Sequence, residues 1–86
     1  MANQYARVKR ENMKQRCLEY LGGKKCTRCG VDSLPYTCYE FHHVNGNKVC
    51  EISKMLNKPW KLIKTELDKC IVLCRNCHGI THYMEG

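Results

Sequence analysis

Two Cys-x-x-Cys pairs constrain this chain more than any other feature of its sequence. Cys26 and Cys29 form the first pair, and Cys74 and Cys77 form the second. Two such pairs supply four thiolates, the tetrahedral ligand set that zinc prefers in closed structural sites. Gly30 follows the first pair directly and allows the tight turn that lets both sulfurs face one ion. The sequence therefore predicts a structural Zn²⁺ ion held by these four cysteines.

The chain is short enough to need such a site. It has 86 residues, and a single core of this size rarely supplies more than a few kcal/mol of stability. A structural zinc ion contributes roughly 10–16 kcal/mol in small peptides, so we expect the metal-free protein to be unfolded or molten. An iron–sulfur cluster and a redox-active pair are the alternatives, but two separated pairs outside a βαβ context favour zinc.

Four further cysteines share no short spacing with one another: Cys17, Cys38, Cys50 and Cys70. Free cysteine commonly behaves as a small hydrophobic residue, so we interpret these four as core filler. A second zinc site built from them is the alternative.

The lack of long apolar segments bears on the cellular compartment and so on the state of the cysteines. No apolar run reaches the roughly 18 residues of a membrane span, and the basic N-terminus lacks the apolar segment of a signal peptide. We therefore expect a cytoplasmic protein without a membrane partner, in which thiols stay reduced. A secreted, disulfide-rich basic peptide is the competing hypothesis.

Basic residues outnumber acidic ones by 15 to 8, which gives a formal net charge of +7. Such an excess suits a polyanionic partner, above all nucleic acid, although a basic surface also serves solubility. Good helix formers and apolar residues at three- and four-residue steps predict an amphipathic helix within residues 1–23, ended by Gly22-Gly23. Its outer face is either solvated or lies along DNA, and the candidate DNA-binding residues are Arg7, Lys9, Arg10, Lys14 and Arg16.

Residues 24–86 mix the periodicities of strands and helices, so the expected fold class is a small α+β zinc-bound domain. A stretch rich in β-branched and aromatic residues predicts a strand, Asn-Gly-Asn predicts a turn, and Pro59 fits the start of a helix. In chain order we expect a strand at 37–44, a turn at 45–47, helical turns near 52–56, a helix after Pro59, a strand at 71–73 and a final helix.

All four histidines fall into two clusters. His42 and His43 are adjacent on a predicted strand, where successive side chains point to opposite faces, so different roles are implied. His78 and His82 are four residues apart on a predicted helix, which places both imidazoles on one face and suits one divalent ion. One strand histidine can join the metal while the other accepts a proton from water. Structural histidines are the alternative.

Taken in order, these motifs resemble the HNH endonucleases of the ββα-metal type, in the zinc-stapled form that is common in phages and mobile elements. The resemblance covers residues 24–83 and rests on Cys26-x-x-Cys29, on Glu40-Phe41-His42-His43, and on the segment from Asp68 to His82 with its second cysteine pair. It implies that residues 24–86 form a zinc-stapled nuclease domain with a ββα-metal core, to which residues 1–23 add a basic helix.

The resemblance also implies a role for each histidine. His43 is implied as the general base that activates the attacking water. His42, His78 and His82 are implied as ligands of a catalytic divalent ion, with Mg²⁺, Mn²⁺, Ni²⁺ and Zn²⁺ as the candidates. Such an ion offsets charge on the scissile phosphate and stabilises the leaving 3′ oxygen while the imidazole removes a proton from water.

One position departs from the family pattern. Lys69 stands where the family has an asparagine that braces the metal loop and helps to orient the base. A lysine cannot reproduce the paired donor and acceptor of an amide, so we expect backbone groups to take over the bracing. A phosphate contact by Lys69 and a weak nuclease are the alternatives. Glu40 is a further acidic candidate near the site, or else an ordinary exposed strand residue.

The resulting functional prediction is a metal-dependent DNA endonuclease or nickase that hydrolyses phosphodiester bonds in double-stranded DNA. The alternative is a non-catalytic zinc-finger DNA-binding module. The protein is expected to act as a monomer or dimer, alone or beside phage packaging or recombination proteins, in the host cytoplasm if phage-encoded. No recognition helix is evident, and nucleases of this kind contact DNA largely through its backbone, so sequence preference is left to partners.

Overall fold

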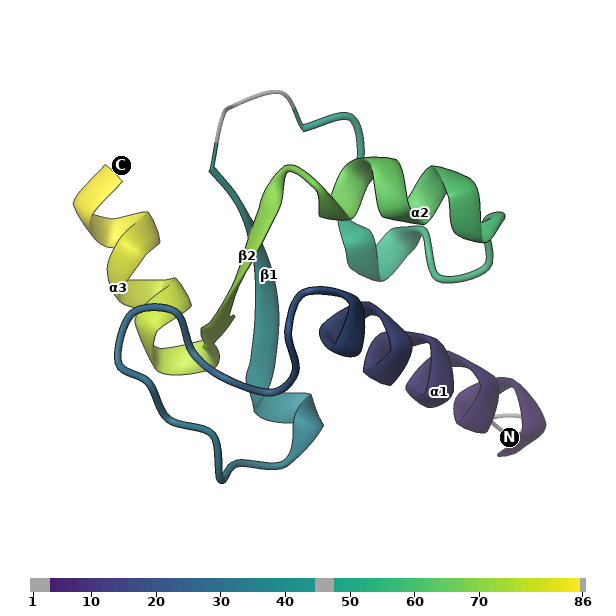
Figure 1. The fold of residues 1–86 in the computed structure, drawn as a ribbon, viewed down its shortest axis with the longest axis horizontal. Helices are drawn as coiled ribbons and strands as arrows, with labels where there is room; N and C mark the ends of the chain where they lie inside the picture. Colours follow the sequence, from purple (N-terminus) through teal and green to yellow (C-terminus); the bar gives the residue numbers. More distant parts are fainter. Residues whose placement is uncertain (1–3, 45–47, 86) are drawn as a thin grey trace.

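Two antiparallel strands lie between the helices of this small α+β domain (Figure 1). The structure is a computed structural model, which describes residues 4–44 and 48–85 and the side chains from residue 8 onward. Strand β1 (Tyr39–His43) pairs with β2 (Cys70–Cys74) in a register that sets His42 opposite Ile71 and His43 opposite Cys70. The pair β1 and β2 is called the hairpin below, although a long segment that contains α2 joins the two strands. Helix α3 (Arg75–Glu85) lies on one side of this hairpin, whereas α1 (Gln4–Tyr20) and α2 (Trp60–Leu67) lie on the other. The expected α+β class is confirmed.

Helix α1 is part of the core. Of the apolar positions that predicted its inner stripe, Cys17 and Leu18 are buried, and Met13 and Leu21 are half-buried. Cys17 packs in one cluster with residues of α2 and β2, and Leu18 packs with Tyr39 of β1. The helix ends as expected at a glycine pair, because Gly22 and Gly23 both adopt a positive φ. The N–H of Gly23 then donates to the carbonyl of Leu18 at 2.8 Å.

Strand β1 is shorter than the sequence predicts. Residues 36–38 form a short 3-10 helix instead, so Thr37 and Cys38 lie outside the strand. The turn follows from Pro35, whose carbonyl accepts a hydrogen bond from the N–H of Cys38. Strand β2 gains one residue at each end relative to the predicted 71–73 and runs directly into α3. The predicted turn at Asn45, Gly46 and Asn47 lies outside the described residues.

The segment between the strands crosses the face of the hairpin that α3 leaves open. It contains a short 3-10 helix at Ile52–Lys54 and then α2, which begins directly after Pro59. Ile52, Ile63 and Leu67 are almost fully buried there. In the described part of the chain, no helix is long and apolar enough to cross a membrane.

Candidate metal sites

The two cysteine pairs meet at one end of the hairpin. Cys26 and Cys29 lie on the loop after α1, Cys74 ends β2, and Cys77 lies in the first turn of α3. Their four sulfur atoms all lie within 4.8 Å of one another. The Cys29 and Cys74 sulfurs are 3.9 Å apart, close to the about 3.8 Å expected for two sulfurs about 2.3 Å from a tetrahedral zinc ion. The predicted four-cysteine cluster is thus confirmed, and it could hold one structural zinc.

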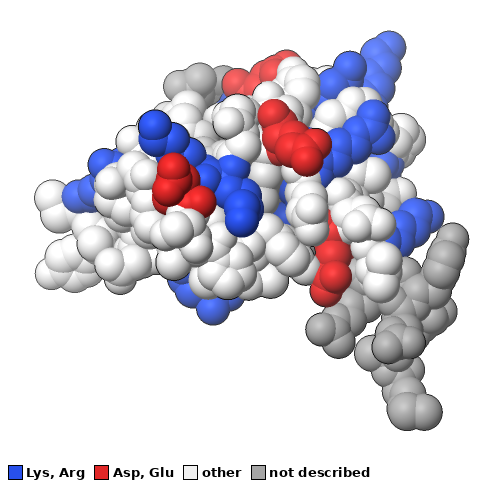
Figure 2. Space-filling model, turned by 60° about the horizontal axis from the view of Figure 1, so that its bottom comes forward, with Lys and Arg blue, Asp and Glu red and all other residues white. Residues whose placement is uncertain are grey.

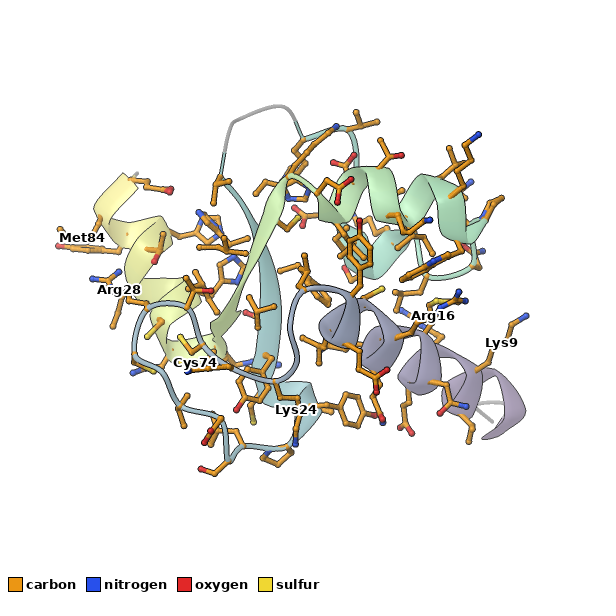
Figure 3. The ribbon with its side chains drawn as sticks, viewed as in Figure 1. Lys9, Arg16, Lys24, Arg28, Cys74 and Met84 are labelled. Atoms are coloured by element: carbon orange, nitrogen blue, oxygen red, sulfur yellow. The ribbon has the colours of Figure 1, made fainter. Side chains whose placement is uncertain are left out.

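Backbone geometry prepares these sulfurs for a cation. The N–H of Cys29 donates to the sulfur of Cys26, and the N–H of Cys77 donates to that of Cys74, both at 3.4 Å. Burial by itself raises the pKa of the Cys26 thiol, but hydrogen bonds from backbone groups outweigh it and lower that pKa. The loop is fixed to β2 because Thr27 donates its N–H to the carbonyl of Val72 at 2.8 Å. Figure 3 shows Cys74 where this loop meets the hairpin.

Three histidines converge on the α3 side of the hairpin. His42 comes from β1, and His78 and His82 come from successive turns of α3. One nitrogen of each ring lies within 4.8 Å of those of the other two. The Nε2 atoms of His78 and His82 are 3.0 Å apart, and the His42 ring centroid lies 5.4 Å from both other rings. Three imidazoles with this spacing could hold a divalent ion.

Carboxylates contact two of these histidines. Glu40 Oε1 lies 2.8 Å from His78 Nδ1, which leaves His78 Nε2 facing His82. A carboxylate on the outer nitrogen of a metal-binding histidine fixes the tautomer and the ring orientation. Glu85 Oε1 lies 3.1 Å from His42 Nε2. Sequence reasoning missed Glu85, although it follows His82 by three residues on the same helix.

His43 lies apart from the three-histidine cluster. Because successive strand residues alternate, its side chain points to the α2 side of the hairpin, where its Nε2 lies 2.8 Å from Glu66 Oε2. Both side chains are nearly inaccessible, with 8% and 4% of their surface exposed. The sequence pattern does not identify Glu66 as a partner of His43. The only signal in the sequence is its position next to Leu67, which lies on the buried face of α2.

Glu66 is a buried carboxylate with several donors. Its Oε2 also accepts the N–H of Val49 at 2.9 Å, and its Oε1 lies 3.0 Å from Lys69 Nζ. Burial raises the pKa of Glu66, but the Val49 amide, Lys69 and His43 outweigh burial and lower that pKa to about 2. The Lys69 side chain is therefore directed toward the buried Glu66 carboxylate. The backbone carbonyl of Lys69 also accepts a hydrogen bond from the N–H of Val44 at 2.9 Å.

The candidate DNA-binding residues of α1 are not equivalent. The Arg16 guanidinium lies 4.0 Å from the centroid of the Trp60 ring of α2, and Lys9 is exposed nearer the N-terminal end of α1 (Figure 3). Arg10 reaches the carbonyl of Ser53 at 3.5 Å. The side chain of Arg7 lies outside the described residues.

Lys14 of α1 shares a hollow with one of the clustered histidines, His78. It is half-buried and lines a hollow together with Glu40 and His78, and burial lowers its pKa. Figure 2 shows Lys and Arg side chains over both ends of the visible face with acidic side chains among them. The basic surface is therefore interrupted by carboxylates.

The other four cysteines are separate from both clusters. Cys17 and Cys70 are buried, and burial raises their pKa values to about 11 and about 12. Cys38 and Cys50 are half-buried. Within residues 4–44 and 48–85 none of the four belongs to a potential metal-binding group. Their interpretation as core filler fits Cys17 and Cys70 best.

The fold and the sites define a small α+β domain with a four-cysteine cluster that could hold zinc. No protein-family model, curated protein or solved structure matches this chain.

Proposed function

We propose that this protein is a metal-dependent endonuclease or nickase of the HNH type that hydrolyses phosphodiester bonds in double-stranded DNA. The observation that carries the proposal is the convergence of His42, His78 and His82 in one group, while His43, which follows His42 directly in sequence, lies outside that group. A histidine kept free of metal can act as a base at neutral pH.

In this proposal the three clustered histidines would hold one divalent ion, and Glu40 contacts His78 Nδ1 so that Nε2 is left for the ion. When bound, that ion would offset the charge of the phosphate and of the leaving oxygen. His43 takes a proton from water, and the oxygen of that water forms a bond to phosphorus. The bond between phosphorus and the 3′ oxygen breaks, and the 3′ oxygen takes a proton from solvent. A zinc ion in the cysteine cluster would fix the start of α3 and hence the positions of its histidines.

Basic side chains supply the attraction for DNA. Lys14 lies in the same hollow as Glu40 and His78, so it is the α1 residue best placed to meet a phosphate near the histidines. Lys9 is exposed and adds charge farther along α1. Binding through such contacts weakens steeply as salt is added.

A plasmid-nicking assay with Mg²⁺, Mn²⁺, Ni²⁺ and Zn²⁺ tests the proposal. The wild type should convert supercoiled DNA to the open circle, and His43→Ala should abolish conversion while DNA binding and zinc content stay unchanged. Asn57→Ala, an exposed substitution, is the matched control and should remain active. An inactive wild type with every metal, or an active His43→Ala, contradicts the proposal. DNA binding without cleavage would instead favour a zinc-finger binding module.

A further inference from the structure

The hydrogen bonds of Glu66 determine which nitrogen of His43 carries a proton. Glu66 Oε2 receives two contacts, from His43 Nε2 at 2.8 Å and from the N–H of Val49 at 2.9 Å. Glu66 Oε1 faces Lys69 Nζ at 3.0 Å. An ionised carboxylate can only accept hydrogen bonds. His43 must therefore donate through Nε2, so in its neutral form Nδ1 carries the free lone pair.

The surroundings of Glu66 keep this arrangement rigid. The carboxylate is 4% exposed, and three donors from three places in the chain hold it. Val49 belongs to the segment that follows β1, Lys69 lies between α2 and β2, and His43 ends β1. In the described part of the chain every buried side-chain nitrogen and oxygen has a partner. The contact described for His43 is made by Nε2 with Glu66, so Nδ1 is the nitrogen of this mostly buried ring that is left to accept a proton from water.

We propose that Glu66 is the positioning residue of His43: its carboxylate fixes the ring and the Nε2–H tautomer, so that Nδ1 is the atom that takes the proton from water. This inference rests on the proposed nuclease function. Lys69 holds the second oxygen of Glu66 and balances its charge. Lys69 and Glu66 together then perform the orienting role for which the HNH pattern uses an asparagine, and Lys69 acts through Glu66 without contacting the phosphate.

Two variants separate positioning from simple stabilisation. Glu66→Met has a similar length but no acceptor, so it should lower kcat by about 100-fold and leave KM and metal affinity unchanged. Glu66→Gln keeps an acceptor oxygen with the same reach, so it should recover most of the lost rate. Glu19→Met, on the exposed face of α1, removes the same charge and should leave kcat unchanged.

Nitrogen-15 NMR of the imidazoles, at a pH where they are neutral, gives a readout independent of activity. His43 should be in the Nε2–H tautomer in the wild type and in Glu66→Gln, and should become a mixture of tautomers in Glu66→Met. If Glu66→Met fails to fold, the wild-type spectrum still decides, because an Nδ1–H tautomer there overturns the inference.

The two proposals fail in different ways. A wild type that cleaves DNA while folded Glu66→Met keeps its kcat and its His43 tautomer overturns the positioning role and leaves the nuclease function intact. A second pattern also overturns the positioning role. If Glu66→Met loses rate, Glu66→Gln does not recover it, and the His43 tautomer does not change, then Glu66 has a purely structural role. A wild type that cleaves nothing with any metal overturns both proposals.

Discussion

Removing the Glu40 carboxylate should weaken metal binding by His42, His78 and His82 about three- to tenfold. Glu40 Oε1 lies 2.8 Å from His78 Nδ1, and its side chain is 35% exposed. A hydrogen bond to a charged group contributes about 1.5–3 kcal/mol. Water replaces part of that at a site this open, and half of the range leaves about 0.8–1.5 kcal/mol. Since about 1.4 kcal/mol corresponds to a factor of ten in Kd, Glu40→Ala should raise Kd about three- to tenfold.

Titration calorimetry measures this effect directly. The protein is first loaded with zinc at the cysteine cluster, and Mn²⁺ or Co²⁺ is then titrated into the histidine site. Glu40→Gln keeps an acceptor but loses the charge, so its Kd should fall between those of the wild type and Glu40→Ala. Glu19→Ala removes an exposed carboxylate from α1 and serves as the control for net charge.

Two results would refute this reasoning. An unchanged Kd in Glu40→Ala would mean that the hydrogen bond does not orient His78 for a metal. An equal loss in Glu19→Ala would mean that the effect comes from the overall charge of the protein. The cobalt spectrum adds a check, because a ring that turns should change the ligand field even where affinity is hardly altered.

Three further predictions concern stability. Chelation of zinc, or Cys77→Ser, should unfold the domain, because a structural zinc contributes roughly 10–16 kcal/mol in small peptides; circular dichroism that stays native after complete metal removal contradicts this. Tyr39→Phe should cost about 2 kcal/mol and lower Tm, because the buried Tyr39 hydroxyl donates to the carbonyl of Val31 and accepts the N–H of Leu34, both at 3.2 Å; an unchanged Tm would show that these bonds contribute nothing net. The pKa of Glu66 falls from 4.5 to about 2 on folding, so its stabilisation is complete above pH 4.5 and is lost as the pH falls toward 2. Urea unfolding of the wild type and Glu66→Gln, with zinc content measured at every pH, should therefore show a stability difference that shrinks below pH 4.5 for as long as both proteins keep their zinc. A constant difference over those points would contradict the assignment.

Much of the metal-binding potential was readable from local spacing. A two-residue gap brings Cys26 near Cys29 and Cys74 near Cys77, and four residues of helix bring His78 beside His82. Such short separations leave the backbone few alternatives, so spacing alone indicates which side chains can meet. Zinc chemistry predicts that the two cysteine pairs join into one cluster, because four thiolate ligands complete a tetrahedron.

Local pattern was less reliable at the ends of elements. Thr37 and Cys38 have the composition of a strand, yet they form a 3-10 turn after Pro35. Arg16 was predicted on an outer basic face, but its guanidinium packs on the Trp60 ring. Propensity describes what a segment prefers in isolation, whereas a neighbouring element can offer a better contact.

The sequence by itself determined the ligand types, the pairing of residues within short spacings and the alternation that separates His42 from His43. Only the tertiary structure decided what each histidine faces. His43 meets Glu66 across 23 residues of chain because α2 packs on the side of the hairpin opposite α3. No periodicity encodes that meeting. It depends on the burial of Ile63 and Leu67, which holds α2 against the hairpin and sets the Glu66 carboxylate beside the ring.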